Sequence, residues 1–309
     1  MSGTPAGARP GSGGIAERVA ALAGAAVAGV RPVGGGDVCD AHRIALSDGR
    51  TVFAKTLHPA PEGFFAAEAA GLELLASTGT VAVPRVLAAG ADVLLLEWIE
   101  PGRADAAQAE RLGRDLAALH STPAPAWGNP DPSRPAYLGP VPLPSPARPP
   151  AAPEDWPAFH AEWRLLPLLR RAVDAGGIRG GDARDVERLC EELCADPGDG
   201  TGPSGPPQPP AVIHGDLWSG NVHWSADGRA RLIGPAAQGG HPETDLGMLE
   251  LFGCPRLERL LAAYEEVRPL PGRRKRLPLH QLQHLLVHAV LFGPGYGARC
   301  GAAARAALG

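Results

Sequence analysis

The chain has 309 residues, of which 44% are hydrophobic, so it is long enough to bury a sizeable core and to form two lobes. Its net charge of -4 and isoelectric point near 6.2 give no electrostatic case for binding nucleic acid or an anionic membrane surface. We therefore expect a small substrate, or at least one that is not a polyanion. High counts of glycine (41) and proline (34) predict many loops.

Five cysteines, an odd number without a C-x-x-C pair, argue against a disulfide framework and a structural zinc site. Cys190 and Cys194 are better explained as one face of a helix than as half of a metal site. No apolar run approaches the roughly 20 residues that span a bilayer. Residues 19–30 resemble a signal-peptide core, but Glu17 and Arg18 directly precede them and a strand follows without a break. A small-residue helix in a cytoplasmic enzyme is the favoured interpretation.

Residues 1–14 are small and lack periodicity, which predicts a disordered tail. A helix at about 15–28 and a strand at 30–33 lead to Gly34, Gly35 and Gly36. Strands at 41–46 and 51–56 follow, joined by a hairpin turn. Glycines let backbone N–H groups approach phosphates closely, so the loop is a candidate nucleotide site, although an ordinary loop would also account for three glycines.

Lys55 lies on the strand after this loop, and Glu68 follows in the helical segment 64–76. A lysine in this place can reach nucleotide phosphates, and a helix glutamate can hold it there. Glu62 and Glu73 are rival partners, but Glu68 best fits the middle of the helix. A solvated surface pair is the alternative explanation.

Two more strands are expected at 86–89 and 93–98. The sequence IEPG at 99–102 then breaks the pattern and indicates a hinge between an N-lobe at 15–99 and a C-lobe at 100–309. Backbone groups of Glu97, Trp98 and Ile99 could meet an adenine edge.

The remainder of the chain is mainly helical in pattern. Helices are expected at about 104–121, 156–175, 182–195, 243–252, 256–267, 279–292 and 298–308, and a hairpin at 222–233. A proline-dense loop at 121–155 carries Trp127 and Tyr137, and Trp156 follows it; these aromatic residues are expected to pin the loop rather than line a cleft. The insertion at 196–210 is expected to be mobile, and the basic run 273–276 to be a solvated loop.

The stretch AVIHGDLWSGN at 211–221 carries the candidate chemistry. Phosphoryl transfer needs a carboxylate that orients and deprotonates the attacking hydroxyl, and a carboxamide oxygen that holds Mg²⁺. Asp216 is the candidate base and Asn221 the candidate metal ligand. One asparagine is only part of a magnesium site, so a second ligand is required. An ordinary turn is the alternative, since Gly, Asp and Asn are common turn residues.

The order of these features matches a kinase-like phosphotransferase. In detail, HGDLWSGNV, ETDLGMLELFG, AAYEEVRPL and HQLQHLLVHAVLFGPGY resemble the fructosamine and ketosamine kinase family, relatives of the aminoglycoside phosphotransferases. GGGDVCDAHRIALSDGRTVFAK and YLGPVPLPS resemble the same family. The likeness therefore runs from residue 15 to the C-terminus.

The resemblance implies an α+β, bilobal protein-kinase-like fold with a small antiparallel-sheet N-lobe and a mainly helical C-lobe. It implies ATP and Mg²⁺ as cofactors and, as the reaction, phosphorylation of a sugar hydroxyl on a small-molecule or protein-bound ketosamine, a deglycation repair acting on ribulosamines, erythrulosamines or fructosamines. By the same resemblance Lys55 would contact the phosphates of ATP and Glu68 would pair with it. Asp216 would be the base, Asn221 a magnesium ligand, and Asp245 a brace for the catalytic loop. The sequence does not distinguish a monomer from a dimer.

One position departs from the family. After the hairpin the family has Asp-Pro-Ala, whose aspartate is the principal magnesium ligand, whereas this chain has GPA at 234–236. Gly234 has no side chain to bind metal, and Glu243 and Asp245 are expected to face away. The hypotheses are a ketosamine kinase with weakened metal use, a pseudokinase of the same fold, and, more remotely, an aminoglycoside-type phosphotransferase. Cys39, beside the glycine-rich loop, is better interpreted as a quiet thiol than as an oxidant sensor.

Overall fold

The computed structural model describes residues 12–34 and 38–309, so Gly35 and Gly36 lie outside the described residues, as does most of the tail expected at 1–14. Helix α1 (Ser12–Ala23) begins inside that expected tail and ends earlier than predicted. It ends there because Gly24 adopts a positive φ of 66°, a common helix terminator. Residues 27–28, expected to be helical, belong to the first strand instead.

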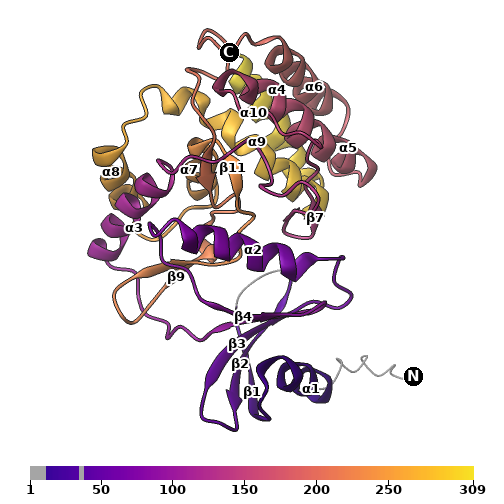
Figure 1. Cartoon of the computed structure of the whole chain (residues 1–309). Helices are drawn as coiled ribbons and strands as arrows, with labels where there is room; N and C mark the ends of the chain where they lie inside the picture. Colours follow the sequence, from indigo (N-terminus) through magenta and orange to yellow (C-terminus); the bar gives the residue numbers. More distant parts are fainter. Residues whose placement is uncertain (1–11, 35–37) are drawn as a thin grey trace, which may run out of the picture.

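A five-stranded antiparallel sheet forms the N-lobe (Figure 1). Its order is β1-β2-β3-β5-β4, with bounds β1 (Val27–Val33), β2 (Asp40–Leu46), β3 (Thr51–Thr56), β4 (Val86–Ala89) and β5 (Val93–Glu97). On β5, Val93 and Leu95 pack in the same apolar cluster as α1, while Leu94 and Leu96 pack with α2 (Phe64–Ser77). Both faces of β5 are therefore covered by helices, which explains its continuous apolar run.

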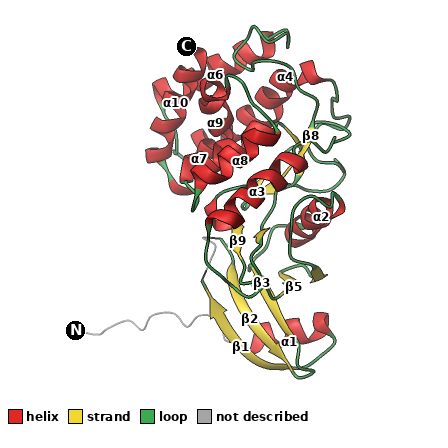
Figure 2. Cartoon of the chain, turned by 90° about the vertical axis from the view of Figure 1, so that its left-hand side faces the viewer, coloured by secondary structure: helices red, strands yellow, loops and turns green. Residues whose placement is uncertain are grey.

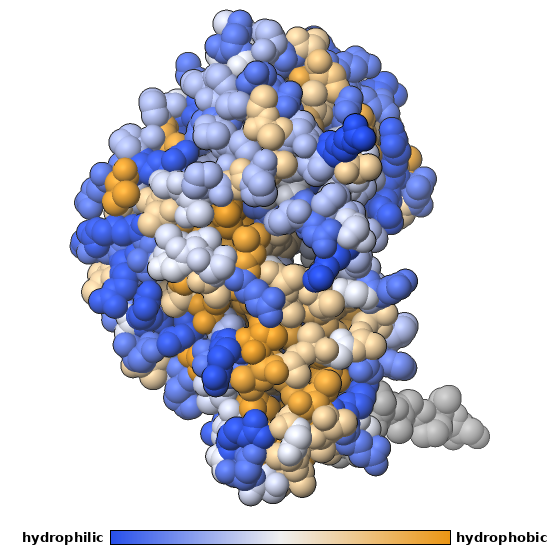
Figure 3. Space-filling model, in the orientation of Figure 1, coloured by the Kyte–Doolittle hydropathy of each residue, from blue (hydrophilic) through white to orange (hydrophobic). Residues whose placement is uncertain are grey.

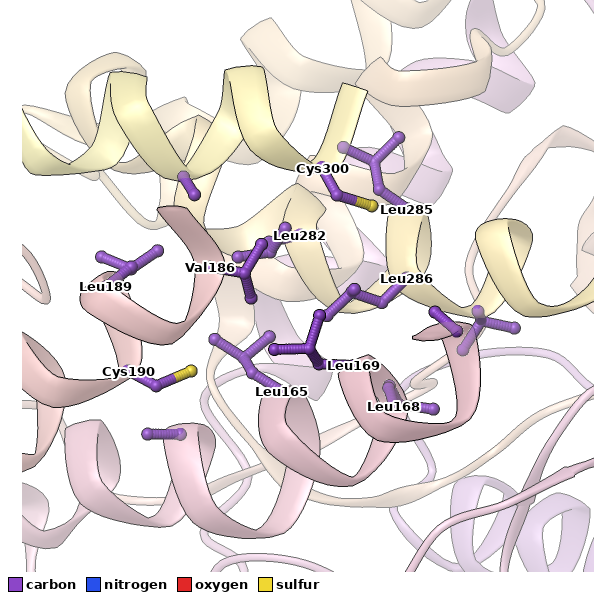
Figure 4. Packing of buried hydrophobic residues seen from close by; sticks show 14 of the residues in the cluster. Leu165, Leu168, Leu169, Val186, Leu189, Cys190, Leu282, Leu285, Leu286 and Cys300 are labelled. Atoms are coloured by element: carbon purple, nitrogen blue, oxygen red, sulfur yellow. The ribbon is translucent and has the colours of Figure 1, made fainter. Parts of the chain in front are cut away.

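The C-lobe is mainly helical, and Figures 1 and 2 show its helices gathered at the end of the molecule away from the sheet. Its helices are α3 (Ala106–Leu119), α4 (Trp156–His160), α5 (Leu166–Asp174), α6 (Gly180–Ala195), α7 (Pro242–Phe252), α8 (Leu257–Val267), α9 (Arg273–Phe292) and α10 (Pro294–Leu308). A π-helical turn at Ala161–Leu165 joins α4 to α5. Leu169, Val186 and Leu286 come from three different helices and meet in the core of this lobe (Figure 4).

Short strand pairs position the central loops of the C-lobe. β8 (Ala211–Ile213) pairs with β11 (Gln238–Gly240), β9 (Val222–Trp224) with β10 (Ala230–Leu232), and β6 (Tyr137–Leu138) with β7 (Val141–Pro142). Between β10 and β11 the chain passes directly beside the loop that leaves β8, because the Ala236 N–H donates to the His214 carbonyl at 3.0 Å.

The long loop before α4 is pinned by its aromatic side chains, as expected. Trp127 is fully buried and its Nε1–H donates to the Ala152 carbonyl at 2.8 Å, and Trp156 is buried as well. Tyr137 is different: its hydroxyl donates to the Glu62 carbonyl at 2.7 Å, but its ring also lines the main cavity. The pinning interpretation therefore covers only part of what Tyr137 does.

The prediction of a loop at 273–276 is wrong, because the run begins a helix, although Arg274 and Lys275 are exposed to solvent as expected. Arg273 begins α9 and is buried, with Nη1 2.6 Å from the Glu250 carboxylate, and Arg276 reaches Glu243 at 2.5 Å. Both acidic partners lie on α7. The run is helical because these arginines find one buried and one partly buried carboxylate on a neighbouring helix, which the local sequence does not show.

Candidate active site

The loop between β8 and β9 carries Asp216. The residue before it, at position 215, has a backbone conformation and close surroundings that only glycine fits. Gly215 has a φ of 81°, and a Cβ added there would lie 2.3 Å from the Ala236 carbonyl oxygen. The Asp216 N–H donates to Nδ1 of His214 at 3.2 Å, and Nε2 of that ring donates to the Ile233 carbonyl at 3.0 Å. Burial lowers the pKa of His214, which keeps the ring in the neutral form that this pattern requires.

Asp245 braces this loop from α7. Its carboxylate accepts from the backbone N–H of His214 at 2.7 Å and of Gly215 at 2.8 Å. Nε2 of His120 donates to the same carboxylate at 3.1 Å, and Nδ1 of His120 lies 3.0 Å from the Tyr264 hydroxyl. Burial alone would raise the pKa of Asp245, but these donors outweigh it and hold the pKa below its usual value. The catalytic loop is therefore fixed by a buried network.

Lys55 and Glu68 form an ion pair, with Nζ 2.7 Å from Oε2. Of the three candidate partners, Glu68 is buried, whereas Glu62 and Glu73 are exposed. Burial alone would lower the pKa of Lys55, but the Glu68 carboxylate, together with smaller effects of Cys39 and Asp216, outweighs it and the pKa is raised. The lysine therefore stays charged at the cavity wall.

Lys55 and Asp216 line the same cavity, which has a volume of about 950 Å³. Burial raises the pKa of Asp216 to about 7, with Lys55 and the hydrogen bond from the Asn221 amide acting in the opposite direction. A carboxyl that titrates near neutral pH suits proton transfer, because a general base works best when its pKa is close to the working pH.

Asn221 joins Asp216 to the segment that follows β10. Its Nδ2 donates to the Asp216 carbonyl at 2.8 Å, to Oδ2 of the same residue at 3.1 Å, and to the Gly234 carbonyl at 3.3 Å. Gly234 has a φ of 60°, and a Cβ added there would lie 2.8 Å from Oδ1 of Asn221. A side chain at position 234 would therefore project towards the oxygen that is the candidate metal ligand.

The residues present do not fit a tightly held magnesium ion. Asn221 supplies one candidate ligand, and Gly234 supplies none. Glu243 is engaged by Arg276, and Asp245 by the loop amides, so both face away from the cavity as expected. Within the described ranges, no group of three or more His, Cys, Asp or Glu side chains could hold a metal ion.

The hinge residues lie apart from this cavity. Glu97, Trp98 and Ile99 are not among its described lining residues, and neither is Gly34. The Glu97 carboxylate accepts from the Arg85 N–H at 3.0 Å, and Trp98 Nε1–H donates to Glu100 at 2.6 Å. Contact between these four residues and a nucleotide therefore stays a prediction.

Comparison with known proteins decides the family. Residues 14–308 match the model of the fructosamine kinase family. The chain belongs to the fructosamine kinase family. A candidate ketoamine kinase of Thermus thermophilus is 38% identical over 267 residues, which cover 86% of this chain and 88% of that protein. The crystal structure of a candidate fructosamine-3-kinase from Thermobifida fusca is 43% identical, with a TM-score of 0.84, and covers 96% of this chain and 99% of its own.

This fructosamine kinase family member also shares its fold with more distant phosphotransferases. The macrolide 2'-phosphotransferase of Brachybacterium faecium matches 96% of both chains with a TM-score of 0.56 and 19% identity. That likeness shows the fold alone. The predicted bilobal, protein-kinase-like fold is confirmed, with an antiparallel sheet in the N-lobe and a mainly helical C-lobe.

The C-lobe end of the cavity in this family member is aromatic and apolar. His288 stacks on Phe252 with ring centroids 4.5 Å apart, and Tyr296 lies 5.0 Å from His288. Phe292 and Leu291 of α9 complete this end, and both are exposed. On the face shown in Figure 3 the outline is indented between the two lobes, and apolar side chains gather below the indentation.

Sequence reasoning missed His120 and Tyr264. His120 directly follows α3 and Tyr264 lies within α8, and neither stands in a motif with Asp245. Their histidine and tyrosine identities alone carry no signal, because the network forms only when three helices meet.

Cys39 is 8% exposed and burial raises its pKa to about 11, so the quiet-thiol interpretation fits better than the oxidant-sensor one.

Proposed function

We propose that this family member is an ATP-dependent kinase that phosphorylates a sugar hydroxyl of ketosamines. The observation that carries the proposal is the Lys55–Glu68 ion pair, which faces the same cavity as Asp216, a carboxyl with a pKa of about 7. Membership in the fructosamine kinase family supports a ketosamine kinase function. Ribulosamines, erythrulosamines and fructosamines are the proposed acceptors, and deglycation in the cytoplasm, where ATP is present, is the proposed role.

No helix within residues 12–34 and 38–309 is long and apolar enough to cross a membrane.

The proposed chemistry follows from the residues around Asp216. The sugar hydroxyl oxygen forms a bond to the γ-phosphorus of ATP while the bond from that phosphorus to the leaving ADP oxygen breaks. The hydroxyl proton passes to the Asp216 carboxylate, whose orientation the Asn221 amide fixes through Oδ2. Lys55 would contact the phosphates, and Glu68 holds its ammonium group in place. We propose that Glu97, Trp98, Ile99 and the glycine-rich loop at 34–36 contribute to nucleotide binding.

The acidic residues that line the cavity favour a ketosamine over a polycationic aminoglycoside. Among the described lining residues they are Glu68, Asp131 and Asp216. Glu68 is paired with Lys55, and Asp131 with Arg134 at 3.0 Å. Only Asp216 remains for a cationic acceptor, whereas an aminocyclitol with several ammonium groups needs several acidic partners. The apolar far end suits the amine substituent of a ketosamine better.

A second candidate, a pseudokinase, is favoured by Gly234. Losing a contact that stabilises the transition state commonly costs several kcal/mol, or roughly 10² to 10⁴ in rate. A chain of this fold could therefore bind nucleotide or sugar with little turnover. The two candidates differ only in whether phosphate is transferred.

Turnover of ATP on a ribulosamine substrate separates these candidates. The chain as it stands would be compared with Gly234→Asp and with Asp216→Asn, each in Mg²⁺ and in Mn²⁺. If the unaltered chain turns over within about tenfold of the rate of Gly234→Asp, a factor worth roughly 1.4 kcal/mol, the result supports the kinase. Activity in Gly234→Asp alone supports the pseudokinase. If Asp216→Asn keeps full activity, the assigned base is wrong.

A further inference from the structure

The backbone around Gly234 is fixed by the catalytic loop on both sides. The Ile233 N–H donates to the Asn221 carbonyl at 3.0 Å, and the Ile233 carbonyl accepts from His214 Nε2 at 3.0 Å. Two residues after Gly234, the Ala236 N–H donates to the His214 carbonyl at 3.0 Å. The direction in which a side chain would leave position 234 is therefore set by hydrogen bonds that do not involve that side chain.

A side chain at position 234 would enter the cavity beside the catalytic residues. The added Cβ lies 2.8 Å from Oδ1 of Asn221, whose Nδ2 holds the Asp216 carboxylate. The φ of 60° favours glycine, and among other residues Asp and Asn tolerate it best. An aspartate and an asparagine at this position would thus occupy nearly the same space with similar backbone strain, and they would differ in charge and in the N–H donors that only asparagine carries.

The net charge of the side chains around Asp216 is small, because position 234 contributes no charge. The charged residues here are Lys55, Glu68 and Asp216, and the first two form an ion pair. One carboxylate is left over. A second carboxylate at position 234 would repel the anionic triphosphate unless a divalent cation stood between them, because unit charges a few ångströms apart interact by several kcal/mol where water is partly excluded.

Two consequences of Gly234 point in the same direction. The protein lacks the carboxylate that would anchor Mg²⁺, and it also lacks the repulsion that would make Mg²⁺ necessary. Glu243 cannot replace the missing group, because its carboxylate is buried against Arg276. We propose that nucleotide binding by this chain is largely independent of Mg²⁺, with Lys55 meeting the phosphates directly, and that Gly234 is the cause. The proposal rests on ATP being the nucleotide whose phosphates Lys55 contacts, as proposed above, and not on the acceptor being a ketosamine.

Equilibrium binding of ATP, measured calorimetrically in excess Mg²⁺ and in excess EDTA, tests this inference without any turnover. The chain as it stands would be compared with Gly234→Asp and with Gly234→Asn. We expect removal of Mg²⁺ to change the dissociation constant of the unaltered chain by less than about threefold, and that of Gly234→Asp by at least about tenfold, as expected for one added unit charge. Gly234→Asn should behave like the unaltered chain.

The asparagine variant is the matched control, because it carries the same backbone strain and nearly the same volume as the aspartate variant. Equal metal dependence in the two variants would overturn the inference, since charge would then not be the cause. A loss of ATP binding by the unaltered chain in EDTA that equals the loss in Gly234→Asp would overturn it as well.

The contribution of Lys55 is tested by comparing ATP with adenosine in EDTA. We expect ATP to bind the unaltered chain more tightly than adenosine, and Lys55→Met to abolish that preference. If the preference persists in Lys55→Met, another group meets the phosphates and this part of the inference fails. Metal-independent binding of ATP without phosphorylation of any ketosamine would support the inference and contradict the proposed kinase activity. If no nucleotide binds in either condition, both proposals fail.

Discussion

The side-chain amide of Asn221 holds Asp216 at two points, donating to its backbone carbonyl at 2.8 Å and to its carboxylate at 3.1 Å. The asparagine therefore orients the candidate base whether or not its own Oδ1 binds a metal. In this chain the orienting role gains weight, because Gly234 offers no second ligand beside that oxygen.

Replacing Asn221 by alanine should impair the chemical step more than nucleotide binding. The Asp216 carboxylate loses the side-chain donor that orients it, and a misplaced base typically costs 10²- to 10³-fold, so we expect kcat to fall by about that factor. The affinity for ATP in EDTA should change by less than about threefold, since Lys55 is untouched. Steady-state kinetics with parallel calorimetry would check both values. A kcat within threefold of the unaltered chain would contradict the orienting role.

The Lys55–Glu68 pair makes a prediction about nucleotide affinity. Glu68→Gln keeps the shape of the side chain but leaves a partly buried ammonium group without its counter-charge, so the lysine should lose its position. We expect KM for ATP to rise by about tenfold or more, a change of at least roughly 1.4 kcal/mol. Glu73→Gln on the same helix is the control, because Glu73 is exposed and was a rival partner. If both variants change KM alike, the pair has no special role.

The outcome at Glu68 shows what the local sequence could predict. A helical period, a strand with an apolar run and a lysine between them are all local features, and β4 and the β2–β3 hairpin were accordingly placed within a residue or two. Asp245 was expected on the supporting helix for a different reason, the family resemblance, and its contacts with the loop amides are consistent with that role.

Features that depend on distant partners could not be predicted in this way. The run 273–276 is expected to be a loop because four basic residues between prolines favour solvent, whereas two of its arginines pair with Glu243 and Glu250 of α7. His120 and Tyr264 were missed because their network joins three separate helices. The cavity likewise combines α2, the 129–143 loop and α9, so its aromatic end had no sequence signature.

Removing the Tyr264 hydroxyl should destabilise the C-lobe. Tyr264→Phe leaves Nδ1 of the fully buried His120 without a partner, which costs about 1–3 kcal/mol. Urea denaturation would measure the loss as a lower midpoint with an unchanged slope. Tyr137→Phe is the matched control, because its hydrogen bond to the Glu62 carbonyl is exposed and should contribute about 0.5–1 kcal/mol at most. Equal losses in the two variants would argue against a buried brace.

A cluster of buried histidines predicts that the protein loses stability in acid. Burial lowers the pKa of His160 to about 3 and that of His284 to about 4, and it places the pKa values of His241 and His280 well below 6.5. The folded protein therefore binds fewer protons than the unfolded chain, whose histidines titrate near pH 6.5. The stabilisation is complete above pH 6.5 and is lost progressively as the pH falls from that value towards the lowered pKa values of the folded protein. Below pH 6.5, each buried ring lowers the free energy of unfolding by up to about 1.4 kcal/mol for every pH unit.

Urea unfolding at pH 7.5, 6.5 and 5.5 would measure this slope. His160→Phe keeps an aromatic ring stacked on Trp156, whose ring centroid lies 4.9 Å from that of His160 in the native protein. Because this variant removes one titrating group, the slope of the unfolding free energy against pH should fall by up to about 1.4 kcal/mol per pH unit. His58→Gln, which replaces an exposed ring, is the control for the loss of a histidine outside the buried cluster. The Glu243 carboxylate lies 3.5 Å from Nε2 of His280, but it already pairs with Arg276. We therefore do not expect Glu243 to stabilise the protonated form of His280 at low pH. A free energy of unfolding that is flat between pH 7.5 and 5.5 would rule out this account.

The aromatic end of the cavity predicts how the acceptor is chosen. Phe292 is 52% exposed and lines the cavity, so its ring is available to cover an apolar amine substituent. Phe292→Ser should raise KM for a ketosamine with an aromatic or long aliphatic amine by about fivefold, which corresponds to roughly 40 Å² of apolar contact at 25 cal/mol per Å². KM for ATP and for a ketosamine of methylamine should stay the same. Val267→Ser, at an equally exposed apolar residue of α8 outside the described lining of the cavity, is the control. If Phe292→Ser affects the methylamine adduct as strongly as the larger ones, the ring acts on the sugar or on the fold instead of on the amine substituent.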